Sequence, residues 1–170
     1  MNGLIPIACV VLNSHGLSPL AKVKWKQNDP QTFTISGDIP TSLTLGVADL
    51  DKLPQQTVSV QEEDGTTTKY SGVLLKAIME KAGAPVGKSL RGKALASYIL
   101  VSARDGYQVV FTLAELEPVF ANEQILVVDK QNDKPLFGYQ GPFRIMCPAD
   151  KAGARSLRML KSIQFVSLRK

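Results

Sequence analysis

The stretch Leu95–Leu113, with the sequence LASYILVSARDGYQVVFTL, decides the fold. Its two halves, 95–102 and 107–113, are rich in β-branched and aromatic residues, which favour strands. Between them lies the turn sequence Ala103-Arg104-Asp105-Gly106. Two such runs that flank an Asp-Gly turn are typical of a β-hairpin. The centre of the chain therefore predicts antiparallel sheet.

Similar short segments lie on both sides of this hairpin. Apolar alternation predicts further strands at 32–36, 57–61, 125–128, 143–147 and 163–168. Helical segments are expected at 43–53, at 71–82 with Ser71 as N-cap, and at 113–117. At least six strands with two or three short helices between them indicate the α+β class, with a mixed β-sheet or barrel-like core. No repeat or linker divides residues 22–170, which we expect to form a single domain.

The first 21 residues leave two interpretations open. Residues 4–12 form a mostly apolar run, too short to span a bilayer as a helix, and Ala21 could precede a cleavage site. A secretory signal fits this pattern, although no Lys or Arg precedes Lys22 and prolines interrupt it. A signal would make the protein periplasmic or secreted. The alternative is an N-terminal core strand.

The positive charge of the chain is local. The net charge of the 170 residues is +5, but residues 144–170 alone hold seven basic residues and one acid, for a net +6. A nucleic-acid-binding protein more often spreads its basic residues along a face with interleaved aromatics. A short cluster suits one or two phosphates or carboxylates, or is simply a solvated basic end.

Several kinds of catalytic or metal site lack the residues they need. The only histidine is His15, within the segment that a signal peptidase would remove, and no glycine-rich nucleotide loop is present. The acids 62–64 precede a glycine and are typical of a solvated turn rather than of a calcium site. Cys147 lies in an apolar strand, where a buried structural thiol is the expected state.

Three motifs, in order and at matching spacing, resemble the molybdopterin-binding domain of the sulfite oxidase family. The first is Tyr70-Ser71-Gly72-Val73-Leu74-Leu75, similar to an aromatic-x-Gly-x-x-Leu entry to a helix. The second is Asp105-Gly106-Tyr107 between two strands. The third is Gly141-Pro142-Phe143-Arg144 with Pro148 and Gly153-Ala154-Arg155-Ser156-Leu157-Arg158. The resemblance covers about residues 32–168.

The resemblance implies a pterin or molybdopterin ligand and a set of residues that hold it. In that family the basic C-terminal run binds the pterin's phosphate. By resemblance, Gly153 would let the backbone approach the phosphate closely, and Arg155 would supply a planar charged fork. Asp105 could accept hydrogen bonds from the heterocycle, and Tyr70 or Tyr107 could stack on it, with packing at the sheet margin as the alternative. The expected ligand-binding residues are Tyr70, Asp105, Tyr107, Arg144, Gly153, Arg155, Ser156 and Arg158.

The chain departs from the family at the metal. The resembled enzymes bind molybdenum through a cysteine between the early strand and the aromatic-x-Gly helix. Here that stretch is 58–65, and no cysteine occurs from Val10 to Met146. We therefore expect no metal and no catalytic residue of this kind.

Three hypotheses follow. The leading one is a non-catalytic, periplasmic pterin-binding domain, with no nucleic-acid partner, that reports its ligand to a membrane signalling partner. The second is a molybdopterin-dependent oxidoreductase with an atypical metal ligand set. The third is a domain that contacts another protein and binds no small molecule.

Overall fold

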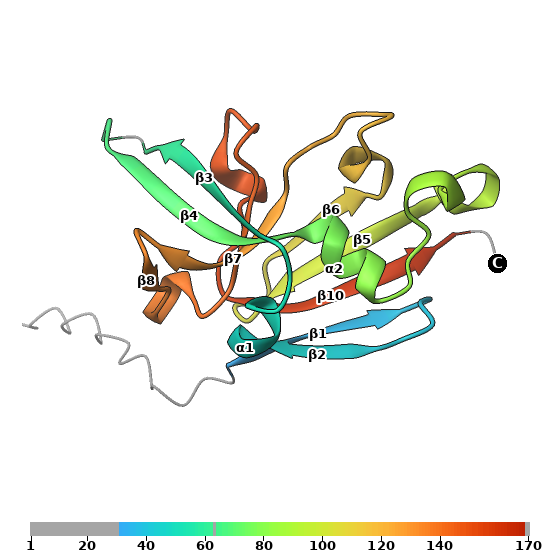
Figure 1. Ribbon diagram of the computed structural model, residues 1–170, viewed down its shortest axis with the longest axis horizontal. Coiled ribbons are helices and arrows are strands. Elements are labelled where there is room, and N and C mark those ends of the chain that lie inside the picture. The colour runs from blue at the N-terminus through green and yellow to red at the C-terminus, as the bar shows by residue number, and fades with distance from the viewer. Residues whose placement is uncertain (1–30, 63, 169–170) are drawn as a thin grey trace, which may run out of the picture.

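The computed structural model describes residues 31–62 and 64–168, which form two open β-sheets with few helices (Figure 1). The signal-peptide prediction for residues 1–21, with Cys9 and His15, lies outside the described residues. None of the helices in the described part is long and apolar enough to cross a membrane.

The first sheet has the strand order β2-β1-β10-β5-β6. The predicted hairpin is confirmed as β5 (Ser97–Ala103) and β6 (Gln108–Thr112). Next to β5 lies β10 (Leu160–Ser167), which pairs on its other side with β1 (Thr32–Gly37). The β1–β10 pair is parallel and the others are antiparallel, so this sheet is mixed, as predicted.

The second sheet carries the motifs of interest. Its strands β3 (Gln55–Gln61), β4 (Thr67–Leu74) and β7 (Leu126–Gln131) are antiparallel neighbours. On the far side of β7 lie β8 (Lys134–Pro135) and β9 (Arg144–Met146). The β3–β4 hairpin projects beyond the sheet at the upper left of Figure 1. Both sheets have free edge strands, so the barrel-like core was wrong.

Two of the helical predictions need correction. Leu43–Gly46 is a strand, β2, that pairs with β1, and only α1 (Val47–Leu50) is helical in that segment. Ser71 caps no helix, because it lies within β4 and its hydroxyl bonds that of Thr57 at 2.8 Å. The helix α2 begins later and spans Leu75–Lys81. The expected turn at 113–117 is a 3-10 helix, Ala114–Leu116.

A close approach of two strands explains one glycine of the resemblance. Gly72 lies at a register shift between β4 and β7. A Cβ at this position would lie 2.1 Å from the Val127 carbonyl oxygen, closer than any real contact. Glycine is therefore required here for the strands to pair.

Glu117 joins three parts of the domain through its buried carboxylate. Lys76 Nζ of α2 donates to Oε2 at 2.9 Å, and the Gly87 N–H donates to Oε1 at 2.7 Å. Burial alone would raise the pKa of Glu117, but the bonds from Gly87 and Lys76 hold it below its ordinary value of 4.5. The ionised carboxylate thus stabilises the fold.

We expect Glu117→Gln to lower the free energy of unfolding by about 2 kcal/mol at neutral pH, the scale of buried hydrogen bonds to a charged group. Because the folded pKa is depressed, this difference is complete above the ordinary carboxyl pKa of 4.5 and is lost as pH falls through the folded value. Urea unfolding at several pH values measures it, with the exposed Glu80→Gln as the matched control. A deficit that does not change with pH would contradict this role.

Candidate functional site

A cleft of about 940 Å³ opens at one end of the second sheet. One wall is the end of the β3–β4 hairpin, and the opposite wall is the segment 146–158 that follows β9. The turn of the β5–β6 hairpin contributes a third side. Six of the eight residues predicted to bind ligand line this cleft: Asp105, Tyr107, Arg144, Gly153, Ser156 and Arg158.

Arg144 is a buried cation in the wall of the cleft. It is 8% exposed, and its Nη1 donates to Tyr70 Oη at 3.2 Å and to Gln140 Oε1 at 3.0 Å. Its Nε is buried and has no hydrogen-bond partner, and among the described residues it forms no ion pair with a carboxylate. Burial lowers the pKa of Arg144, since desolvation disfavours its charge. An anion in the cleft would relieve this cost.

Tyr70 supports Arg144 from behind instead of lining the cleft. Its ring is 2% exposed and lies 5.2 Å from the Arg144 guanidinium carbon. Its hydroxyl donates to Glu62 Oε1 at 3.0 Å, and burial raises its pKa. The packing alternative for Tyr70 is therefore the one that the structure shows.

The β5–β6 turn brings Asp105 and Tyr107 to the cleft. Asp105 Oδ1 accepts the Tyr107 N–H at 2.9 Å, which fixes the turn. Tyr107 is half exposed, and its hydroxyl donates to the Ala154 carbonyl at 3.0 Å. Tyr107 thus ties the β5–β6 turn to the loop on the opposite wall while it lines the cleft.

The opposite wall offers positive charge and open backbone. Gly153 begins a short 3-10 helix, Gly153–Arg155, and a Cβ on it would meet no protein atom within 4 Å. Packing inside the protein therefore does not require glycine there, and the position lies open to the cleft. Lys151 and Arg158 line the same wall, and the Arg158 guanidinium stacks on the Tyr139 ring at 5.3 Å. Ser156 Oγ accepts the Cys147 N–H at 3.1 Å.

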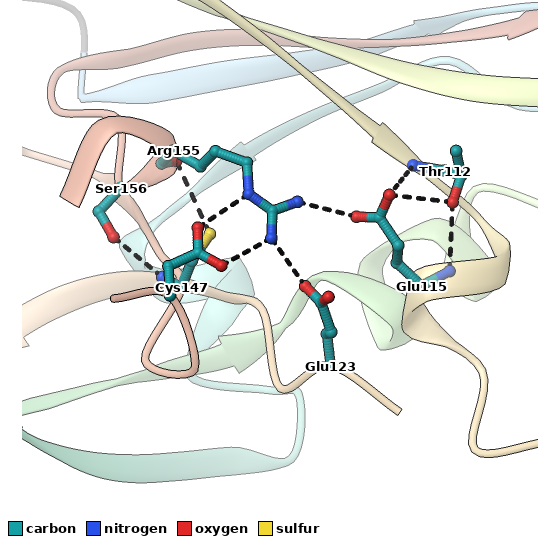
Figure 2. Close-up of polar contacts among 7 residues, drawn as sticks. Thr112, Glu115, Glu123, Cys147, Arg155 and Ser156 are labelled. Atoms are coloured by element: carbon teal, nitrogen blue, oxygen red, sulfur yellow. Dashed lines mark hydrogen bonds and ion pairs between the residues drawn. The ribbon is translucent and has the colours of Figure 1, made fainter. Parts of the chain in front are cut away.

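Arg155 does not line the cleft, unlike the residues on both sides of it. Its guanidinium lies among three carboxylates, from Glu115, Glu123 and Asp150, as Figure 2 shows for the first two. The distances are 3.0 Å from Nη1 to Glu115, 3.0 Å from Nη2 to Glu123, and 2.6 and 2.8 Å to Asp150. These bonds, first that to Asp150, raise the pKa of Arg155. The charged fork expected for a phosphate is engaged elsewhere.

The cleft also contains acidic residues that the sequence did not predict to bind ligand. Glu62 and Asp64 line it from the β3–β4 turn, where we expected only a solvated loop. Asp64 Oδ1 accepts the N–H and hydroxyl of Thr66 at 2.9 and 2.6 Å, which lowers the pKa of Asp64. Their place in the cleft could have been predicted, because 58–65 is the stretch in which the resembled enzymes carry their metal ligand.

The residues of the cleft fit the organic part of a phosphorylated pterin better than a thiolate-bound metal. Cys147 is the only thiol among the described residues, and burial raises its pKa to about 12. Its Sγ lies 3.7 Å from the Arg155 carbonyl oxygen, and the residue is 5% exposed. Within residues 31–62 and 64–168, no group of three His, Cys, Asp or Glu side chains is arranged to hold a metal ion. The cations that line the cleft, Arg144, Lys151 and Arg158, by contrast, suit an anion.

Comparison with known proteins gives a family model and a similar fold. The family model described as "Oxidoreductase molybdopterin binding domain" matches residues 20–170. Among solved structures, the chain is similar to the sulfane dehydrogenase SoxCD from Paracoccus pantotrophus, with a TM-score of 0.62 at 14% sequence identity. The match covers 81% of this chain and 38% of the SoxCD chain, so this chain spans less than half of that protein's length. Such low identity shows a shared fold alone. No curated protein sequence matches the chain.

Proposed function

The chain belongs to the oxidoreductase molybdopterin-binding domain family, and we propose that its cleft binds a phosphorylated pterin without a metal held by a protein thiolate. The observation that carries the proposal is the buried Arg144, a cation that faces the cleft with no carboxylate partner among the described residues. Charge-assisted hydrogen bonds from arginine to a phosphate are among the stronger ones in proteins. Lys151 and Arg158 add positive charge on the same wall.

The acidic residues of the cleft support the heterocyclic part of the ligand. A pterin ring carries an amino group and ring N–H groups, which donate hydrogen bonds to carboxylates. Glu62, Asp64, Asp105 and Asp150 supply carboxylates to the cleft, which Lys151 and Arg158 also line. A cleft lined by both acceptors and cations suits a ligand with a donor-rich ring and an anionic tail.

The metal-free part of the proposal rests on the chemistry of the side chains. A bound molybdenum centre supplies redox chemistry, and in the resembled enzymes a cysteine thiolate holds it. The stretch 58–65 contributes amide and carboxylate groups to the cleft and no thiol, and the one thiol that lines the cleft, Cys147, is buried in the segment that follows β9. We derive no redox step from these residues. The periplasmic location and the membrane signalling partner stay predictions from the sequence.

Calorimetric titration of the full chain tests the proposal with dihydroneopterin monophosphate, dihydroneopterin and adenosine monophosphate. We expect the phosphorylated pterin to bind at least about tenfold more tightly than the unphosphorylated one, since a charge-assisted hydrogen bond contributes about 1.5–3 kcal/mol. Adenosine monophosphate controls for phosphate binding alone and should bind more weakly than dihydroneopterin monophosphate. No heat with both pterins, or equal binding of all three, would overturn the proposal.

Elemental analysis and mass spectrometry of protein purified from its own host separate the metal-free proposal from the oxidoreductase hypothesis. We expect a released pterin and no stoichiometric molybdenum. About one molybdenum atom per chain would overturn the metal-free part and favour an atypical ligand set.

A further inference from the structure

We propose that Arg155 is a positioning residue, which ties the cleft-lining loop 147–156 to the segment 112–123 and makes no contact with the ligand. This inference rests on the proposed function for its ligand, because the loop is one wall of the pterin cleft. It differs from the role that the resemblance implies for this arginine, a charged fork on the phosphate.

The geometry engages every nitrogen of the Arg155 guanidinium, with four of its five N–H donors in hydrogen bonds. Nε and Nη2 form a paired contact with the two oxygens of Asp150, within the same loop. Nη1 donates to Glu115, and Nη2 also donates to Glu123, which fixes the loop to a segment 32 to 40 residues earlier in the chain (Figure 2). The guanidinium carbon lies 5.3 Å from the centre of the Phe111 ring. Each nitrogen of the fork is thus engaged within the protein.

The local charge also excludes an anion at this position. Three carboxylates surround one guanidinium, so this cluster (Glu115, Glu123, Asp150 and Arg155) carries a net negative charge when all four groups are ionised. A phosphate that approached Arg155 would meet these carboxylates first. Arg144, in β9, differs from Arg155 because it forms no ion pair among the described residues, and the Glu62 carboxylate is linked to it only through the Tyr70 hydroxyl.

Along the loop, the residues around Arg155 line the cleft and Arg155 does not, so the cluster positions the cleft wall. Gly153, Ala154 and Ser156 line the cleft, whereas Arg155 between them does not. The Tyr107 hydroxyl holds the Ala154 carbonyl, and the Cys147 N–H holds Ser156 Oγ. The bonds from Arg155 to Glu115 and Glu123 attach the loop at a further point, so that it is fixed before a ligand arrives. Preorganised donors bind more tightly because no ordering cost accompanies binding.

The paired substitution Glu115→Gln with Glu123→Gln tests this role, since neither residue lines the cleft. It leaves Arg155 and its contact with Asp150 in place and keeps the size of both side chains. If Arg155 positions the loop, affinity for dihydroneopterin monophosphate should fall about fivefold or more, mainly through a slower association rate, because a smaller fraction of molecules holds the competent loop. If Arg155 instead binds the phosphate, release from two competing carboxylates should make binding tighter. The two roles therefore predict opposite signs, and tighter or unchanged binding overturns the proposal.

Hydrogen exchange of the ligand-free protein separates this inference from the proposed function. We expect faster exchange of the amides in 147–156 in the paired variant than in the wild type, because the loop opens locally more often. Unchanged exchange would overturn the positioning role even if pterins bind. Faster exchange in a protein that binds no pterin would support the tie and reject the proposed ligand. Glu80→Gln, an exposed acid on α2, controls for the loss of negative charge and should change neither measurement.

Discussion

Arg144→Gln is expected to weaken the binding of dihydroneopterin monophosphate by about a hundredfold, because loss of one partner of a desolvated charge pair costs about 2–5 kcal/mol. Arg144 lines the cleft and is 8% exposed, and among the described residues it forms no ion pair, so a phosphate in the cleft would be its anionic partner. Calorimetry measures the loss directly. Arg91→Gln, at an exposed position away from the cleft, is the matched control.

The same substitution should leave the ligand-free protein as stable as the wild type, or more so. Replacing a buried charge that lacks an ionic partner by a neutral side chain removes a desolvation cost. Glutamine can still bond Gln140 or Tyr70, the two partners of Arg144. We therefore expect an unchanged or higher Tm without ligand and a smaller ligand-induced rise in Tm. A variant that loses stability but keeps full affinity would show that Arg144 is structural.

Phe143→Ala should lower the free energy of unfolding by about 3–5 kcal/mol, the usual cost of truncating a buried aromatic ring. Phe143 is 0% exposed and packs edge-on against Phe33, with ring centres 4.9 Å apart and planes at 67°. It precedes Arg144, so it anchors the start of β9 against the core from β1. Urea unfolding measures the loss as a lower midpoint at constant slope.

Phe137→Ala is the matched control for this truncation. Phe137 is 82% exposed, and its removal should change stability by less than about 0.5 kcal/mol. Equal losses in the two alanine variants would contradict the core position of Phe143. Phe143→Leu should fall between wild type and alanine, since leucine fills part of the cavity.

The sequence was sufficient for elements with a clear local pattern. The β5–β6 hairpin has alternating strands on both sides of an Asp-Gly turn, and it was predicted to within about two residues. The segment 43–53 was ambiguous, because Leu-Thr-Leu before Val-Ala-Asp-Leu fits a short strand or a helical turn. The first part of the segment is a strand because it pairs with β1, and the local sequence alone does not predict such pairing. The division into two sheets likewise depends on contacts between distant residues.

Some residues of the candidate site could likewise be predicted from local sequence, and others could not. Arg144 and Gly153 could be predicted because they belong to short motifs within one continuous run that folds into one wall. Arg155 has the residue type and neighbours of an anion-binding arginine, yet two of its three acidic partners come from Glu115 and Glu123, far upstream. The net +6 of residues 144–170 therefore overstated the charge available to a ligand. A charge count over one segment leaves out acidic residues from elsewhere in the chain that folding places beside it.

The parallel pairing of β1 with β10 has a consequence for the order of assembly. β10 lies between β1 and β5, so the β1–β2 and β5–β6 hairpins have no contact within the sheet until this last described strand has left the ribosome. Contacts between residues so distant in sequence make folding slow. The loop that forms one wall of the cleft directly precedes β10. A nascent chain halted before residue 160 would thus expose apolar strand edges and hold the cleft-lining loop without the strand that follows it, which makes late synthesis the vulnerable stage for aggregation.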